Sequence, residues 1–177
     1  MENEPAITSD IKQITASIGG ELVGLEFRMK TPGSFERKVK ADMEQKGVGE
    51  KTSIAGLYDV IRYTNMSTPE SLTKNYLDTV EKLKEKGYTL NKVKNTWTNP
   101  KSSYKGINAV FLAPNGEPFE LQFHTKESFG LKQGPLHKLY EEYRLPSTSV
   151  DRAAELERQM LYLSAGLQVP KDIDKIK

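Results

Sequence analysis

Residues 116 to 128 read GEPFELQFHTKES, and the alternation of apolar and polar side chains predicts a β-strand over residues 117 to 125. On such a strand the two sets point to opposite faces, Phe119, Leu121 and Phe123 to one and Glu120, Gln122 and His124 to the other. The first face is typical of a protein core. An ordinary half-exposed strand more often carries Thr, Lys or Ser opposite its core. An acid, an amide and an imidazole in register therefore indicate a functional face.

Length and composition favour one folded domain. The chain has 177 residues, of which 36% are hydrophobic, and aromatic residues occur throughout, so it can bury a core of ordinary size. A net charge of +2 is too small to indicate nucleic-acid binding by bulk charge. The absence of cysteine excludes disulfides, thiolate zinc sites and cysteine nucleophiles. No run of about 18 apolar residues is present, so we expect a soluble protein or a domain excised from a longer chain, without a membrane segment.

The remaining periodicity predicts an alternation of helices and strands. Helices are expected over residues 9–18, 32–46, 69–86, 133–144 and 150–165, with Thr68 as a helix N-cap. Strands are expected over residues 21–30, 58–64, 88–97, 107–113 and 117–125, and Asn115-Gly116 predicts a hairpin between the last two. This order predicts an α+β fold with a mixed or antiparallel central sheet flanked by helices. We expect one domain over residues 1–145 and, over 146–177, a C-terminal helical extension that packs on it.

Residues 28 to 38, RMKTPGSFERK, gather cations around a predicted strand-to-helix junction. Arg28 and Lys30 fall on one face of the strand, Ser34 lies in the first turn of the helix, and Arg37 and Lys38 follow one turn later. Helix N-terminal N–H groups combined with several cations suit a polyphosphate. The same pattern is also that of a solvated basic helix.

Two further groups of residues have chemistry that a core does not need. Asp59 and Glu120 are carboxylates on separate predicted strands, and such a pair suits Mg²⁺, which takes one or two carboxylates and leaves its other positions to phosphate and water. Alternatively, each carboxylate pairs with a cation within the sheet. In the loop SSYKG, Tyr104 can stack on a nucleic-acid base and Lys105 can meet its phosphate, unless Tyr104 is simply a packed loop residue.

Taken in order, four segments resemble the synthetase domain of the RelA/SpoT family, the pyrophosphokinases that make guanosine tetraphosphate and pentaphosphate. The segment RMKTPGSFERK is similar to the family's ATP-binding motif, and DVIRYT is similar to the strand with its Mg²⁺-binding Asp. SYKGIN is similar to the segment whose Tyr stacks on the acceptor base, and FELQFHT to the strand with the catalytic Glu. The resemblance covers residues 10 to 145 and does not include the metal-dependent hydrolase domain of the long family members.

The resemblance implies a role for each of these segments. ATP would be bound by Arg28, Lys30, Ser34, Arg37 and Lys38; Asp59 and Glu120 would be catalytic and would hold Mg²⁺; and the acceptor would be bound by Tyr104, Lys105, Asn108, Gln122 and His124. The implied reaction transfers pyrophosphate from ATP to the ribose 3′-hydroxyl of a purine nucleotide or of an RNA such as tRNA. Small relatives of this kind include toxins. The resemblance therefore implies a location in the cytoplasm of the producing cell, or of a target cell if the chain is delivered as a toxin domain, and a possible cognate immunity protein or antitoxin.

The chain departs from the family pattern at the acceptor side. Asn108 stands where the family usually has His, His124 stands where it usually has Arg, and Arg62 follows Asp59 without the usual Gly-x-Arg spacing. Because edge contacts to the base decide which base is preferred, we expect an adenine nucleotide or an RNA 3′ end to be a better acceptor than GDP or GTP.

Two other functions remain as alternatives. Ser-Thr-Ser at residues 147–149 followed by Glu-Leu-Glu at 155–157 imitates the motif order of mono-ADP-ribosyltransferase toxins, although the acidic pair lies in a predicted helix. The second alternative is a non-catalytic binding module for nucleotides or RNA on the synthetase fold. Retention of both carboxylates argues against the second alternative.

Overall fold

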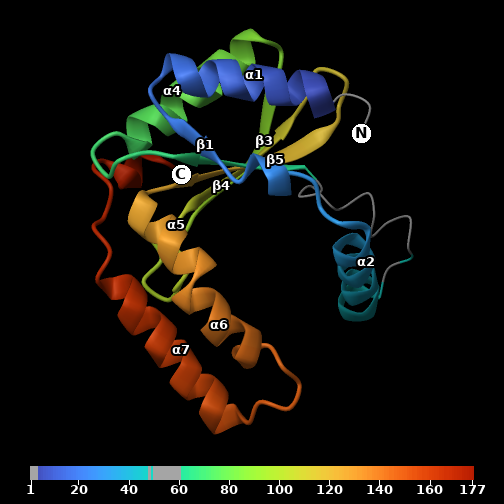
Figure 1. Cartoon of the computed structure of the whole chain (residues 1–177), viewed down its shortest axis with the longest axis vertical. Helices are drawn as coiled ribbons and strands as arrows, with labels where there is room; N and C mark the ends of the chain where they lie inside the picture. The colour runs from blue at the N-terminus through green and yellow to red at the C-terminus, as the bar shows by residue number, and fades with distance from the viewer. Residues whose placement is uncertain (1–3, 48, 50–60) are drawn as a thin grey trace.

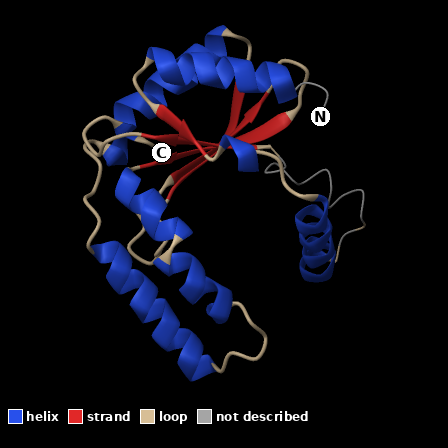
Figure 2. Ribbon diagram, in the orientation of Figure 1, coloured by secondary structure: helices blue, strands red, loops and turns tan. Residues whose placement is uncertain are grey.

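The computed structural model describes residues 4–47, 49 and 61–177, and a five-stranded mixed sheet lies at its centre (Figures 1 and 2). The strand order is β1-β2-β5-β4-β3, in which only β2 and β5 run parallel to each other. The strands are β1 (Glu21–Val23), β2 (Arg62–Met66), β3 (Thr89–Asn95), β4 (Ile107–Leu112) and β5 (Pro118–His124). The α+β class with a mixed sheet is therefore confirmed.

Helices lie on both sides of this sheet, as Figure 1 shows. The helices α1 (Glu4–Ser17) and α4 (Leu72–Glu85) cover one face. On the other side are α5 (Lys126–Gln133), α6 (Pro135–Tyr143) and α7 (Val150–Ala165), whereas α2 (Pro32–Lys46) stands apart from the sheet. Within the described ranges, no helix has both the length and the apolar character required to cross a bilayer.

The core lies between the sheet and the layer of α1 and α4, and β5 is at its centre. Phe119, Leu121 and Phe123 are fully buried there, as the alternation of the sequence predicts. The ring of Phe119 stacks on Phe111 at 5.7 Å and meets Tyr63 edge to face at 5.9 Å. Each such buried side chain stabilises the fold by about 1.5–3 kcal/mol through removal of apolar surface from water. One face of β5 is thereby fixed against α1 and α4, which leaves the other face for α5 to α7.

The β4–β5 hairpin forms where the Asn-Gly pair predicts it. Gly116 has a φ of 86°, a left-handed conformation that favours glycine, and its N–H donates to the carbonyl of Ala113 at 2.7 Å. The two strands then pair in register from Leu112 opposite Pro118 to Ile107 opposite Phe123. This register places Asn108 next to Gln122 on the polar face of the sheet.

Three expected boundaries are wrong. The strand predicted over residues 21–30 ends at Val23, because Gly24 takes a left-handed conformation (φ 65°) and a 3₁₀ turn, η1 (Leu25–Phe27), follows. Arg28 therefore caps a turn instead of sharing a strand face with Lys30. The N-cap of α4 is Ser71 rather than Thr68, and the helix expected over residues 9–18 begins at Glu4. The helix expected near residues 133–144 corresponds to α6, whereas α5 before it is a helix that the sequence pattern did not predict.

The C-terminal segment returns to the side of the sheet that α1 and α4 cover. After α7 the chain forms the 3₁₀ turn η2 (Ile173–Lys175), and Ile173 and Ile176 are buried in the main hydrophobic core. Asn95 at the end of β3 donates from Nδ2 to the carbonyl of Ile173 at 2.9 Å and to that of Ile176 at 3.0 Å. The last residues are thus part of the core of the domain and not only of the helical layer.

Candidate functional site

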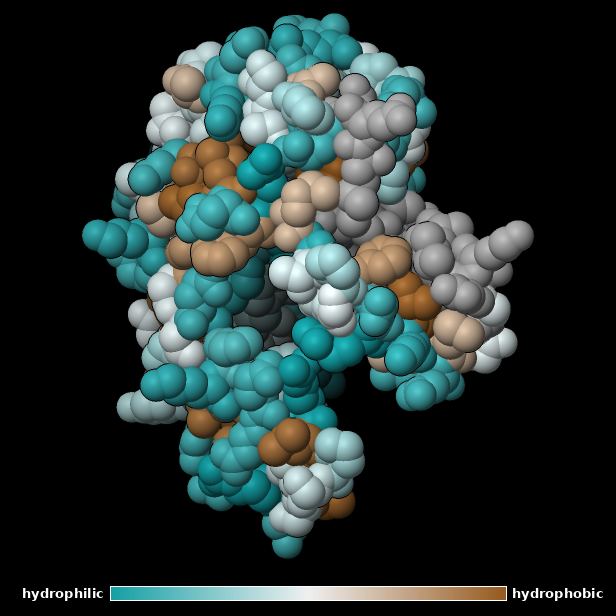
Figure 3. Space-filling model, turned by 45° about the vertical axis from the view of Figure 1, so that its right-hand side comes forward, coloured by the Kyte–Doolittle hydropathy of each residue, from teal (hydrophilic) through white to brown (hydrophobic). Residues whose placement is uncertain are grey.

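A cleft of about 810 Å³ separates the polar face of the sheet from the helices α5, α6 and α7. The space-filling view shows a hollow between the upper body of the molecule and the lower helical lobe (Figure 3). Basic side chains from three elements line the cleft, namely Arg62, Lys94 and Lys132. Aromatic and apolar side chains line it as well, among them Phe27, Tyr104, Phe129, Leu136 and Tyr140. Flat apolar walls combined with several cations suit a nucleotide, which has a planar base and an anionic phosphate chain.

Glu120 lies on the polar face of β5 and pairs with Arg62 of the neighbouring parallel strand. The two residues are register partners, and Arg62 Nε lies 3.0 Å from Glu120 Oε1. The Nε–H bond does not point at that oxygen, so the contact is an ion pair rather than a directed hydrogen bond. The Glu120 side chain is only 13% exposed, so the nearby guanidinium offsets part of the cost of burying a carboxylate.

Gln122 connects Glu120 to helix α5. Its Nε2 donates to Glu120 Oε1 at 2.5 Å, and its Oε1 accepts from Lys132 Nζ at 2.6 Å. Burial lowers the pKa of Lys132 to about 8, Arg62 contributes in the same direction, and Glu120 opposes both. The ammonium also lies over the rings of Tyr104 and Phe129, 6.0 Å and 5.9 Å from their centroids. Lys132 is therefore a positive group held at the wall of the cleft by an amide and two aromatic rings.

His124 is fully buried and belongs to a chain of hydrogen bonds that connects Ser128, His124, Tyr104 and Asn108. Ser128 Oγ lies 2.9 Å from His124 Nδ1, and Tyr104 Oη lies 2.9 Å from His124 Nε2. The Tyr104 hydroxyl donates to Asn108 Oδ1 at 2.6 Å, so Nε2–H of the imidazole donates to the phenol oxygen, and Ser128 donates to Nδ1. Burial lowers the pKa of His124 to about 3, with help from the charge of Lys132, so the ring is neutral. Burial also raises the pKa of Tyr104.

Gly106 makes this packing possible. A Cβ atom at that position would lie 2.7 Å from His124 Cε1 and 2.9 Å from Tyr104 Oη, closer than real Cβ contacts. Any side chain there would push the imidazole or the phenol out of place. The Gly in the SYKGIN segment is therefore required by the approach of the loop to His124.

Lys105 takes a different direction from its neighbour Tyr104. Its ammonium donates to the main-chain carbonyls of Asn99 at 2.8 Å and of Thr96 at 3.3 Å, and burial lowers its pKa. In this structure Lys105 thus holds the loop before β4, whereas Tyr104 lines the cleft. Of the five residues expected at the acceptor, the structure brings Tyr104, Asn108, Gln122 and His124 together.

The basic segment is not assembled into one phosphate site in this structure. Arg28 Nε pairs with Glu4 of α1, and its Nη1 donates to the carbonyl of Leu25 at 2.9 Å. Lys30, Ser34, Arg37 and Lys38 lie on or just before α2, which Pro32 opens at its first position with Thr31 as N-cap. None of the five residues is among those that line the cleft in the described part of the chain. Asp59, the second expected carboxylate, lies outside the described residues.

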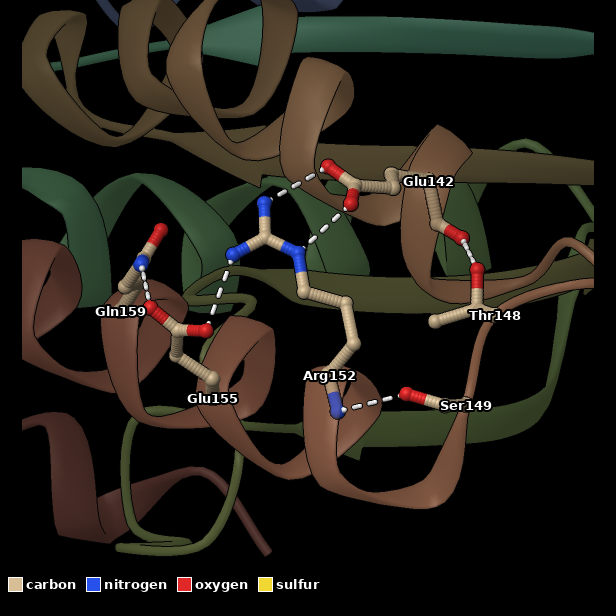
Figure 4. A network of polar contacts seen from close by, with 6 residues as sticks. All are labelled: Glu142, Thr148, Ser149, Arg152, Glu155 and Gln159. Carbon is tan, nitrogen blue, oxygen red and sulfur yellow. Dashed lines mark hydrogen bonds and ion pairs between the residues drawn. The ribbon is translucent and has the colours of Figure 1, made fainter.

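The Ser-Thr-Ser segment serves the connection between α6 and α7 (Figure 4). Ser149 Oγ accepts from the backbone N–H of Arg152 and caps α7, and Thr148 Oγ1 donates to the carbonyl of Glu142 at 2.5 Å. Glu155 lies on α7 and pairs with Arg152, which also forms two contacts to Glu142 at 2.6 Å and 3.0 Å. These residues tie two helices together, and Glu155 lies on a helix rather than on a strand, so they do not form the site of an ADP-ribosyltransferase.

None of the three basic residues of the cleft, Arg62, Lys94 and Lys132, is among the site residues predicted from the sequence. Arg62 is the register partner of Glu120, but this pairing requires the parallel alignment of two strands that are distant in the sequence. Lys132 projects from α5, which the sequence analysis did not predict. A local signal for that helix exists, because Thr125 and Ser128 form a capping box directly after β5. Recognition of this box would have placed Lys132 at the last turn of a helix that starts at the functional strand.

Neither a protein-family model nor a curated protein matches the sequence, but solved structures match the fold. The Type VI effector Tas1, from a complex with its immunity protein, has a TM-score of 0.58 and 18% identity, covering 91% of this chain and 90% of that chain. A GTP pyrophosphokinase family protein from Streptococcus pneumoniae has a TM-score of 0.59 and 19% identity, covering 93% and 83%. Small alarmone synthetase 1 from Bacillus subtilis, bound to its product pppGpp, has a TM-score of 0.59 and 16% identity, covering 91% and 85%. The chain therefore has the fold of a small RelA/SpoT-like synthetase domain, as its four motifs imply.

Proposed function

We propose that the protein is an ATP-dependent pyrophosphokinase that modifies the ribose 3′-hydroxyl of a purine nucleotide or of an RNA end. The observation that carries this proposal is the position of Glu120, a mostly buried carboxylate beside a nucleotide-sized basic and aromatic cleft, on the strand that resembles the family's catalytic strand. The fold shared with alarmone synthetases supports the same reaction class.

In the proposed reaction the acceptor 3′-oxygen forms a bond to the β-phosphorus of ATP. The bond from that phosphorus to the oxygen shared with the α-phosphorus breaks, and AMP leaves. Glu120 accepts the proton of the attacking hydroxyl. Arg62, a cation that lines the cleft, stabilises the charge that spreads over the transferred group.

Donor binding is assigned to the basic segment, with Lys30, Ser34, Arg37 and Lys38 on the phosphates of ATP. Arg28 is assigned to the same site by its place in the motif. Its guanidinium contacts Glu4 in this structure, so it would have to exchange that carboxylate for a phosphate when ATP binds. A phosphate chain offers more anionic oxygens than one glutamate, which favours the exchange.

The carboxylates of the candidate site also suit a magnesium ion. Both contacts to the Glu120 carboxylate fall on Oε1, and Oε2 accepts no hydrogen bond from residues 4–47, 49 and 61–177. A carboxylate oxygen of this kind is a ligand that Mg²⁺ prefers, together with phosphate and water. Glu120 and Asp59 are the residues that would hold the ion, and the ion when bound would neutralise part of the polyphosphate charge.

For the acceptor we propose an adenine nucleotide or an RNA 3′ end in preference to GDP or GTP. Tyr104 offers a ring at the wall of the cleft, and stacking on a ring tolerates any purine. The two side chains bonded to its hydroxyl are neutral, because His124 is buried without charge and Asn108 accepts from the phenol. Where the family has Arg and His, this chain thus has an uncharged chain of hydrogen bonds, and donors to a guanine edge are fewer.

Growth inhibition is the proposed biological effect. Tas1, which shares the fold, was solved with an immunity protein, and this supports a toxin role with a cognate immunity protein for the present chain. The resemblance covers the synthetase part of the long family members and does not extend to their hydrolase domain, which fits a role in making the product rather than in removing it. Consumption of ATP or modification of tRNA in the cytoplasm of a target cell would then stop growth.

The test is incubation with γ-labelled ATP and Mg²⁺ over a panel of GDP, GTP, AMP, ADP, ATP and bulk tRNA. We expect the label to move to an adenine nucleotide or to tRNA, and Glu120→Gln to abolish the transfer with little change in Tm. Glu127→Gln, an exposed residue in the first turn of α5, is the matched control and should retain activity. A fully active Glu120→Gln variant would contradict the assignment of the site, and GDP as the best acceptor would contradict the acceptor proposal.

A further inference from the structure

We infer that Lys132 is a positioning residue, which orients the amide of Gln122 and through it the carboxylate of Glu120. This inference rests on the proposed function, because it concerns the group that would accept the proton in pyrophosphate transfer. It goes beyond that function in assigning a role to a residue of α5 that belongs to none of the four motifs. The contacts that carry it are three consecutive polar contacts across the wall of the cleft.

The direction of each contact follows from the chemistry of the end groups. The ammonium of Lys132 can only donate, so the atom of Gln122 that lies 2.6 Å from it must be the carbonyl oxygen. The amide nitrogen then faces Glu120 Oε1 at 2.5 Å, where an ionised carboxylate can only accept. The two charged ends thus determine the orientation of an amide whose two ends would otherwise be interchangeable.

The consequence appears at the carboxylate. Oε1 of Glu120 receives the amide of Gln122 and the ion pair of Arg62, so it is held from two sides. The side chain therefore has one anchored oxygen, and Oε2 is the oxygen available to a hydroxyl or a metal ion. Without the ammonium, the amide of Gln122 is free to turn its carbonyl oxygen toward Glu120, where two acceptors would repel each other and the carboxylate would move.

Lys132 is itself held in place by its surroundings. The capping box of Thr125 and Ser128 fixes the start of α5 directly after β5, so the helix that carries Lys132 grows from the catalytic strand. The ammonium lies at about equal distances from the ring centroids of Tyr104 and Phe129, 6.0 Å and 5.9 Å. Such contacts attract the cation and restrict the rotamers of a long side chain. The ammonium is thus held in a position from which it orients the amide of Gln122.

The kinetic test compares Lys132→Met, which keeps the length of the side chain, with Lys132→Arg, which keeps a donor-only cation. We expect Lys132→Met to lower kcat by about 10- to 100-fold, as small displacements of reacting groups do, with KM for ATP and acceptor within about 2-fold. Lys132→Arg should restore most of kcat. Lys126→Met, an exposed change in the first turn of α5, is the control and should behave as wild type. A raised KM for the acceptor with unchanged kcat would mean that Lys132 binds the acceptor, and would overturn the inference.

A second measurement does not depend on activity. The side-chain amide of Gln122 in the free protein can be followed by ¹⁵N NMR and assigned through its loss in Gln122→Glu. We expect its two protons to stay well resolved in wild type and Lys132→Arg, and to move toward the values of exposed glutamines in Lys132→Met. An unchanged signal in Lys132→Met would overturn the inference. If the signal changes but wild type transfers no pyrophosphate, the orientation of Gln122 by Lys132 stands and the proposed function fails.

Discussion

Acid should destabilise this protein through one buried histidine. His124 is fully buried between Ser128 and Tyr104, and burial together with the charge of Lys132 lowers its pKa from an ordinary 6.5 to about 3. The folded protein therefore keeps this ring neutral over a pH range in which the unfolded chain binds a proton. The stability that depends on His124 is fully present above about pH 7 and is lost as the pH falls from 6.5 toward 3.

The magnitude follows from the two pKa values. Below pH 6.5, each decrease of one pH unit lowers the free energy of unfolding by about 1.4 kcal/mol. Between pH 7.5 and pH 5 the free energy of unfolding therefore falls by about 2 kcal/mol. Paired carboxylates such as Glu4, whose pKa the side chain of Arg28 lowers, lose their contribution only at lower pH. The window from pH 7.5 to pH 5 thus isolates the histidine.

The assay is urea denaturation at half-unit pH steps over this window, for wild type and for His124→Gln. The variant loses the titrating ring, and we expect its unfolding free energy to fall by about 2 kcal/mol less than that of wild type between pH 7.5 and 5. His137→Gln is the matched control, because His137 is the other histidine of the chain and is exposed on α6, and it should keep the wild-type pH dependence. Parallel curves for wild type and His124→Gln, or an NMR titration of His124 near pH 6.5, would refute the reasoning.

Two further predictions concern the packing around the site and the chain end. Gly106→Ala should lower the Tm measured by calorimetry by several degrees, because the added methyl group would lie 2.7 Å from His124 Cε1. Gly130→Ala is the control, since the space around its Cβ in α5 is open, and it should leave Tm unchanged or raise it slightly. Asn95→Ala should cost about 1–3 kcal/mol of unfolding free energy in urea, since it leaves the carbonyls of Ile173 and Ile176 without their donor. An unchanged urea midpoint for Asn95→Ala would show that these bonds do not hold the C-terminal segment.

The sequence predicts well those structural features that depend on residues close together in the chain. The alternation of β5 separates its core face from its polar face, and Asn115-Gly116 determines the hairpin, because side-chain direction and turn geometry are local properties. The end of β1 at Gly24 is less predictable. Its apolar alternation continues to Met29, but the left-handed conformation of one glycine breaks the strand, and nothing in the pattern requires it.

The site is predictable only in part. The strand face and its three polar residues follow from periodicity, and the segment around Tyr104 follows from resemblance. The partners of these residues do not, because Arg62 reaches Glu120 through long-range pairing of parallel strands and Lys132 reaches Gln122 from a separate helix. The contact of Arg28 with Glu4 is of the same kind, since it depends on where α1 packs. Contacts between elements depend on tertiary packing, which a pattern of single residues does not encode.

The parallel pairing of β2 with β5 also affects the order in which the chain folds. Strands β3, β4 and β5 follow one another as antiparallel neighbours, so their contacts close short loops. Pairing of β2 with β5 must instead close a loop that contains α4, β3 and β4, and the entropic cost of such closure delays it. Arg62 meets Glu120 only at that step. A partly folded chain can thus hold a formed meander before Arg62 and Glu120 lie side by side, so this wall of the cleft is completed at the end of folding.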